Sequence, residues 1–372
     1  MKVLIVNPIL YTNENRNIKK VNTIKDTMIY DLCLAFKKKG CDVTLAASDL
    51  YKPSEIESYP FSIIWMRTRL TKLFPPHTLP YCPEVKKIAK SGNFDLIITS
   101  EVFSLNSLKL ALCTPKNLIV WQELGKHNRI FHGLASKFWH GIVAKIGFKK
   151  ALIVARSVQA REFISKYCKN VSDTIIDHGV NIEKFIPCIE KDNQFAISSQ
   201  LISRKHIEKS IEAFSKYLNK YDDSAKLYIM GDGDEKENLR KLAKDLGAEK
   251  NIIFTGKLGH NELIEILKKS IAMLVYTEKD NNMVSVVESI ALATPVITTD
   301  IPYNASYIKA EKLGIVNNNW NENDLRKLAT SDEYINNCMN YRKYLPTEYK
   351  AEQFLKVKGL FDEHKGQNLK NI

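Results

Sequence analysis

Two carboxylates flank a short polar loop in the last third of the sequence: Asp280 begins the loop, and Glu288 lies eight residues later. The apolar run 271–276 before the loop predicts a buried strand, and a helix is expected to begin directly after the loop. Loops that leave a parallel strand and enter a helix bind anionic ligands. Two carboxylates there suit hydroxyl groups instead, because ionised oxygens repel phosphate and accept strongly from hydroxyls. Phosphate on backbone amides, with hydroxyls on carboxylates, describes a nucleotide sugar.

A second group of candidate residues lies at 199–206, between a predicted strand and an amphipathic helix. Lys205, and with it Arg204, are suited to neutralise a diphosphate leaving group, whose departure develops negative charge in the transition state. The alternative is that both are exposed basic residues without a chemical role.

A glycine-rich turn, Gly231-Asp232-Gly233-Asp234, follows another predicted strand. It resembles the start of a dinucleotide-binding fingerprint, but Lys236 occupies the position of the third glycine. Two aspartates would also repel a pyrophosphate. The pattern therefore argues against a nicotinamide-dependent dehydrogenase.

The elements that must position these residues alternate between strands and helices. Short apolar strands separated by helices predict parallel sheets covered on both faces, and 372 residues are enough for two domains. Strands are predicted at 3–6, 42–46, 94–99, 117–120 and 151–155, and at 195–198, 226–230, 251–254, 271–276 and 295–298. The predicted fold is α/β, with two Rossmann-like domains facing a central cleft. The predicted boundaries are 1–187 for an N-terminal acceptor-binding domain, 188–346 for a C-terminal nucleotide-sugar-binding domain, and 347–372 for a helical tail.

Charge is distributed unevenly along the chain. Residues 1–170 contain 27 Lys and Arg and 12 Asp and Glu, a net charge of +15, whereas the remainder has a net charge of −2. An anionic membrane surface and nucleic acid are the two partners that a basic half favours, and solvated lysine is the third explanation. Interleaved aromatic clusters for base stacking are not evident, so we predict no nucleic-acid partner. The seven scattered cysteines indicate reduced thiols, and we assign no metal ligand.

The segment around Asp280 resembles the signature of the retaining family 4 glycosyltransferases, which have the GT-B architecture. Their pattern is Glu, seven residues, Glu, a helix of small residues and Gly-Thr-Pro-Val. Asp280 stands at the first Glu, Glu288 at the second, and Thr294-Pro295 at the end of the pattern. The resemblance implies that Asp280 faces the donor sugar hydroxyls and Glu288 the ribose hydroxyls. It also implies a C-terminal helix that crosses back to the first domain.

The same resemblance assigns further residues. Lys205 aligns with the family's lysine, Gln200 replaces its arginine, and Arg204 is a candidate substitute for that missing charge. Donor contacts are expected from Gln200, Gly231, Gly233, Thr255, Asn281, Asn282, Met283, Val284 and Glu288. In the first half, Gln122 and Glu123 stand where the family often has His-Asp near the sugar and acceptor, with His127 as a nearby alternative.

These expectations describe a retaining, metal-independent glycosyltransferase of bacterial surface polysaccharide synthesis (capsule, exopolysaccharide or lipopolysaccharide). It would use a UDP- or GDP-linked sugar as substrate, no cofactor, and a glycan or lipid-linked acceptor. We expect a cytoplasmic protein, peripheral at the inner face of the cell membrane. A non-catalytic GT-B subunit that supports a partner glycosyltransferase is the chief alternative. A nucleic-acid binder and a sheet-based epimerase are the others.

Overall fold

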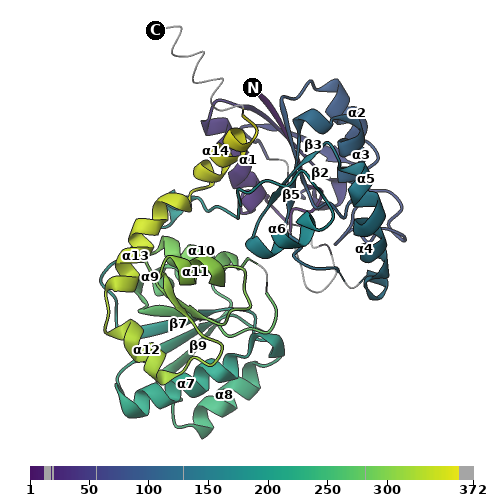
Figure 1. Cartoon of the computed structure of the whole chain (residues 1–372). Coiled ribbons are helices and arrows are strands. Elements are labelled where there is room, and N and C mark those ends of the chain that lie inside the picture. The colour runs from purple at the N-terminus through teal and green to yellow at the C-terminus, as the bar shows by residue number, and fades with distance from the viewer. Residues whose placement is uncertain (12–17, 19–20, 56, 129, 281, 360–372) are drawn as a thin grey trace, which may run out of the picture. The chain divides into compact units, whose positions relative to one another are not determined.

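The chain forms two compact units, each built around its own sheet (Figure 1). The computed structural model describes residues 1–11, 18, 21–55, 57–128, 130–280 and 282–359. Unit 1 comprises Met1–Gly179 together with the segment that begins at Thr347, and unit 2 comprises Val180–Pro346. The boundaries predicted from the sequence were after residues 187 and 346.

The sheet of unit 1 is entirely parallel, with strand order β3-β2-β1-β4-β5-β6. Its strands are β1 (Lys2–Val6), β2 (Asp42–Ser48), β3 (Ser62–Met66), β4 (Leu96–Ser100), β5 (Leu118–Gln122) and β6 (Leu152–Ala155). Chain order reverses between β1 and β4, and the crevice at the carboxyl ends of such neighbouring strands is where doubly wound sheets bind ligands.

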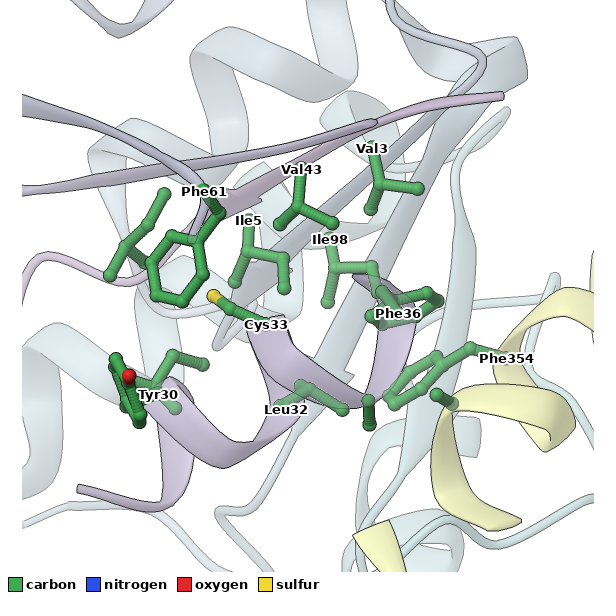
Figure 2. Packing of buried hydrophobic residues seen from close by; sticks show 14 of the residues in the cluster. Val3, Ile5, Tyr30, Leu32, Cys33, Phe36, Val43, Phe61, Ile98 and Phe354 are labelled. Carbon is green, nitrogen blue, oxygen red and sulfur yellow. The ribbon is translucent and has the colours of Figure 1, made fainter. Parts of the chain in front are cut away.

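Helices cover both faces of this sheet. They are α1 (Met28–Lys38), α2 (Val85–Ser91), α3 (Leu105–Cys113), α4 (Leu134–Phe138), α5 (Lys145–Gly147), α6 (Val158–Ser165) and α14 (Thr347–Val357). Figure 2 shows Phe354 of α14 beside Phe36 of α1, and their ring centroids are 6.2 Å apart. Both rings are fully buried. The C-terminal helix therefore completes the core of unit 1, as the resemblance implied.

Unit 2 repeats the plan with strand order β12-β11-β10-β7-β8-β9, again all parallel. Its strands are β7 (Gln194–Ser198), β8 (Lys226–Met230), β9 (Ile252–Gly256), β10 (Ala272–Leu274), β11 (Val296–Thr298) and β12 (Gly314–Val316). Its helices are α7 (Ile207–Lys220), α8 (Lys236–Asp245), α9 (His260–Lys269), α10 (Val284–Ala291), α11 (Ala305–Ala310), α12 (Glu322–Ala329) and α13 (Glu333–Tyr341). Among the described residues, no helix is long and apolar enough to cross a membrane.

The structure adds one strand to each sheet that the sequence analysis did not identify. These are β3 and β12, and each lies at one edge of its sheet. The residues of β12 are all only half-buried, as are three of the five in β3. An edge strand pairs on one side only, so less of its surface needs to be apolar.

Candidate functional site

The basic turn and the acidic loop of unit 2 meet at the carboxyl edge of its sheet. The Lys205 ammonium lies 2.7 Å from one oxygen of Asp280, and the Arg204 guanidinium lies 3.2 Å from the other. Thr277 also donates a hydrogen bond to Asp280, at 2.5 Å. The side chains of Lys205 and Asp280 are 10% and 14% exposed, so solvent screens this pair only weakly. Two of the predicted site residues are thus joined directly, and a third lies beside them.

The order of strands in the sheet explains why Lys205 and Asp280, which are 75 positions apart in the chain, are in contact. β7 and β10 are paired neighbours, so the loops at their carboxyl ends lie side by side. The backbone N–H of Glu278 donates to the carbonyl oxygen of Arg204 at 3.1 Å, which ties the two loops together. His206 has a left-handed conformation with φ 41° and turns the chain from the basic residues into α7.

Glu288 lies near the middle of α10, as its fifth residue, in a different environment. Its side chain is 14% exposed, and burial raises its pKa from the usual 4.5 to about 7. His260 lies 3.7 Å away, but its side chain is half exposed, so solvent screens the interaction between the two side chains. No hydrogen bond reaches the Glu288 carboxyl from any residue that the structure describes. This carboxyl therefore keeps its hydrogen-bonding capacity for another molecule.

The glycine-rich turn after β8 packs against the loop after β7. A side chain at Gly231 would place its Cβ 1.8 Å from the carbonyl oxygen of Ser199, and one at Gly233 would lie 2.3 Å from that of Leu201. The N–H of Leu201 donates to the carbonyl of Asp232 at 3.0 Å. The two glycines therefore allow the turn to approach the neighbouring loop, and the predicted close approach to a nucleotide stays a prediction. The exposed Gln200 lies on the same loop.

The remaining donor-loop residues have mainly backbone partners. The Met283 N–H donates to the buried Asn304 side chain at 2.6 Å, so Asn304 fixes the start of α10, whose first residue is Val284. The Thr255 hydroxyl lies within hydrogen-bonding distance of two backbone carbonyls, that of Ile229 on β8 at 3.3 Å and that of Gly256 on β9 at 3.0 Å. Asn282 is half-buried, and Asn281 lies outside the described residues. The sequence analysis did not identify Asn304 or Thr277, because neither lies in the pattern that defined the loop.

In unit 1, the two residues expected near a sugar differ in availability. Gln122 is fully buried: its Oε1 accepts from the Val102 N–H at 2.8 Å, and its Nε2 donates to the Leu124 carbonyl at 3.1 Å. Both ends of this amide therefore stabilise the backbone. Glu123 is half-buried and pairs with Arg156 at 2.8 Å.

Arg156 and Glu123 belong to a polar cluster at the carboxyl ends of β4, β5 and β6. The Arg156 guanidinium also donates to His178 Nε2 at 3.3 Å and stacks 3.8 Å from the Trp121 ring. Burial, and then Arg156, lower the pKa of His178 to about 3, so its ring is neutral. Burial raises the pKa of Glu101 to about 7, although Arg156 opposes the shift.

Glu123 of this cluster was predicted from the sequence, but Glu101 and Arg156 were not, because each is a single residue that follows a separate strand. The feature that could have predicted the cluster is that its residues follow the carboxyl ends of neighbouring strands. Glu101 follows β4 directly and has a left-handed backbone with φ 66°, which is rare for a residue with a side chain. Its carboxylate accepts from the Glu123 N–H at 2.7 Å and so fixes the loop after β5.

His127 lies away from this cluster, in a packed aromatic group. Its ring nitrogens contact the Ser136 hydroxyl at 3.1 Å and the Tyr167 hydroxyl at 3.0 Å. Phe163 and His140 pack against the ring edge to face. Burial lowers the pKa of His127, which favours the neutral ring. Its role as the alternative sugar contact stays a prediction.

Two doubly wound parallel units, with a C-terminal helix returned to the first, define the GT-B class of glycosyltransferase fold. Residues 181–341, nearly the whole of unit 2, match the family Glycosyl transferases group 1.

Curated relatives match over about two thirds of the chain. The alpha-monoglucosyldiacylglycerol synthase of Streptococcus pneumoniae is 25% identical over 266 residues, 64% of this chain and 59% of that protein. The N-acetyl-alpha-D-glucosaminyl L-malate synthase of Bacillus anthracis is 32% identical over 249 residues, 61% of this chain and 62% of that protein. The chain thus spans about three fifths of the length of these relatives.

Solved structures support the fold over almost the whole chain. The apo form of the lipopolysaccharide outer core galactosyltransferase WaaB has a TM-score of 0.65 at 14% identity, covering 96% of this chain and 99% of that one. A sucrose-phosphate synthase from Thermosynechococcus elongatus has a TM-score of 0.66 at 17% identity, covering 97% and 99%. At these identities the likeness establishes the architecture alone.

Proposed function

We propose that this protein is a glycosyltransferase that moves a hexosyl group from a nucleotide sugar to a glycan or lipid-linked acceptor in surface polysaccharide or glycolipid synthesis. One observation carries the proposal: the loop before α10 and the helix itself carry two carboxylates, Asp280 and Glu288, with contrasting hydrogen-bonding partners. Asp280 forms ion pairs with both Lys205 and Arg204, whereas the Glu288 carboxyl accepts no hydrogen bond from the residues that the structure describes. The match of residues 181–341 to Glycosyl transferases group 1 supports the same assignment.

In the donor complex, Glu288 accepts hydrogen bonds from the ribose hydroxyls. Lys205 and Arg204 turn from Asp280 towards the diphosphate, and Asp280 then accepts from hydroxyls of the transferred sugar. The N-terminal amides of α10 add partial positive charge to the same place. These residues position the donor rather than transfer protons.

The transfer itself proceeds with retention and without a metal ion. The bond between the anomeric carbon and the diphosphate oxygen breaks, and the acceptor oxygen forms its bond to that carbon on the same face. The acceptor's hydroxyl proton passes to the departing diphosphate, so no protein nucleophile or cofactor is consumed. The positive charges of Lys205 and Arg204 support this scheme, since they can stabilise the leaving group as it departs.

The acceptor interacts with unit 1 in this proposal, near Glu101, Glu123 and Arg156. The relative from Streptococcus pneumoniae is named for a diacylglycerol glycolipid, which supports a lipid among the acceptors. The net charge of +15 over residues 1–170 supports an anionic membrane as partner, at the cytoplasmic face. We propose no nucleic-acid partner.

A non-catalytic subunit is the second candidate, and the pairing of Asp280 favours it. A carboxylate that already neutralises Lys205 and Arg204 stabilises the loop without any ligand. A subunit that only supports a partner enzyme would need nothing more from these residues.

Thermal unfolding with UDP, GDP, ADP, CMP and their common sugar conjugates separates the two candidates. A nucleotide at about 100 times its dissociation constant adds about 2.7 kcal/mol to the free energy of unfolding. We expect one base to stabilise the parent protein and not Glu288→Ala. Glu249→Ala is the matched control, because Glu249 is an exposed glutamate of the same unit. If no nucleotide stabilises the parent, the donor site is refuted and the non-catalytic subunit becomes the better explanation.

A further inference from the structure

A continuous helical segment of unit 1 exposes a row of large apolar side chains. The segment consists of α4, a π-helical stretch (Trp139–Ala144) and α5. Residues four apart lie on the same side of a helix. Leu134, Phe138, Ile142 and Ile146 have this spacing, and they are 67%, 62%, 50% and 74% exposed. Soluble surfaces rarely gather apolar residues in this way unless they bind something.

The same segment is basic. Residues 134–150 contain four lysines, all exposed, and no aspartate or glutamate. They are Lys137, Lys145, Lys149 and Lys150. An apolar row flanked by lysine is the pattern of helices that lie in the interface of an anionic bilayer. The positive charge of these lysines therefore favours an anionic lipid surface over an uncharged or basic partner.

An apolar cavity of about 370 Å³ opens beside this row. That volume lies in the range of ligand pockets. Its walls come from the helical segment, from residues 72–80, and from the loop between β4 and α3. Large apolar side chains in these walls include Leu73, Phe74, Leu79, Phe103, Phe138 and Trp139.

The cavity is connected to the polar cluster of unit 1 through one short loop. Phe103 lines the cavity, and Glu101, two residues earlier, belongs to the cluster. The indole N–H of Trp139 donates to the carbonyl oxygen of Val102 at 2.9 Å, which fixes the cavity wall to this loop. A hydrocarbon chain in the cavity would therefore contact the loop that also carries Glu101.

We propose that the exposed row of α4–α5 lies in the interface of an anionic membrane, and that the cavity receives one hydrocarbon chain of the acceptor lipid. The term acceptor rests on the proposed function, whereas lipid binding does not. The occupant is a lipid because its two parts, an anionic surface and an apolar chain, match the lysines and the cavity on adjoining surfaces.

Vesicle binding tests the membrane surface. Sedimentation with phosphatidylglycerol and with phosphatidylcholine vesicles should show preference for the former. Ile146→Glu combined with Phe138→Glu should lower the partition coefficient at least tenfold. Ile186→Glu is the matched control, since Ile186 is 73% exposed but lies in unit 2. Equal binding of the double variant and the control would overturn the proposal and would favour a protein partner for this surface.

Fluorescence quenching tests the cavity. Phosphatidylglycerol with brominated acyl chains quenches only tryptophans that touch the chain, and Trp139 lines the cavity. We expect strong quenching in the parent protein that Trp139→Phe removes. Ala135→Phe, which fills the cavity from the same wall, should reduce the quenching at least threefold while vesicle binding persists. Vesicle binding without quenching of Trp139 would refute the chain in the cavity.

Experiments can refute the lipid proposal without refuting the donor proposal, and the reverse also holds. The surface variant Phe138→Glu/Ile146→Glu should keep the thermal shift caused by a nucleotide, because no residue of unit 2 is changed. A protein that binds vesicles but no nucleotide would refute the donor site alone. A protein that binds a nucleotide but no vesicles would refute the lipid surface alone.

Discussion

Replacing Glu288 by Gln should stabilise the protein at alkaline pH and abolish its affinity for a nucleotide. The folded carboxyl has a pKa raised to about 7, against 4.5 for an ordinary glutamate. Between these pH values the folded protein holds a proton that the unfolded chain has lost. Stability therefore falls as pH rises from about 4.5 to about 7 and is constant above that range. Gln has no proton to lose, so the variant lacks this fall.

The size of the effect follows from the two pKa values. Their difference corresponds to about 3 kcal/mol, and relaxation around the ionised carboxylate makes this an upper limit. We expect Glu288→Gln to match the parent near pH 5 and to exceed it by about 1 to 3 kcal/mol at pH 8. Glu101 also has a raised pKa, but it is present in both proteins and cancels in the comparison.

The assay is urea unfolding at half-unit steps of pH from 4.5 to 8.5, with Glu249→Gln as the exposed control. A nucleotide titration at pH 6 and pH 8 accompanies it. The ionised carboxylate accepts hydrogen bonds from ribose hydroxyls more strongly than the protonated carboxyl does, so the parent should bind the nucleotide more tightly at pH 8. If Glu288→Gln shows the same pH slope as the parent, the carboxyl is not buried in the way we describe. If the variant keeps its nucleotide affinity, Glu288 is not a donor contact.

Three further outcomes are expected. Gly231→Ala places a Cβ 1.8 Å from a backbone carbonyl oxygen and should cost about 2 kcal/mol or more in urea unfolding, whereas Gly141→Ala, with open space around it, should cost nothing. Asp280→Asn removes the counter-charge of Lys205, whose side chain is 10% exposed, and should lower stability by about 1 to 3 kcal/mol, part of which the double variant Lys205→Met/Asp280→Asn recovers. Phe354→Ala should cost about 3 to 5 kcal/mol, because this fully buried ring fills the core of unit 1; a loss below 1 kcal/mol would show that α14 is not part of that core.

Much of the fold could be predicted because its signals are local. Central strands such as Val3–Val6 are apolar throughout, since both of their faces are covered by helices. The loop before α10 was predictable for a similar reason: strand, polar loop and helix follow one another without interruption. The edge strands β3 and β12 were not predicted, because strands that are partly exposed lack the continuous apolar run that marks a buried strand in the sequence.

The candidate site was predictable in its members but not in its contacts. The sequence marks Lys205 and Asp280 separately, and nothing in their spacing says that they are ion partners. That contact depends on β7 and β10 being neighbours, which strand order decides and chain order does not. The cluster around Arg156 illustrates the same limit, because its residues come from four separate strand ends and loops.

Asp280, in the loop before α10, and Glu288, on α10, have contrasting partners, and this difference bears on which ligand the site favours. Asp280 accepts from Lys205, Arg204 and Thr277, whereas Glu288 accepts from none of the residues that the structure describes. A ligand that has phosphate alone would draw Lys205 and Arg204 away from Asp280. The Asp280 carboxylate would then lose its positively charged partners, which is costly because it is only 14% exposed. A ligand with both phosphate and sugar hydroxyls supplies a new partner to each charge. Binding of the two parts is therefore coupled through Asp280, and the site as built favours an intact nucleotide sugar over a free diphosphate.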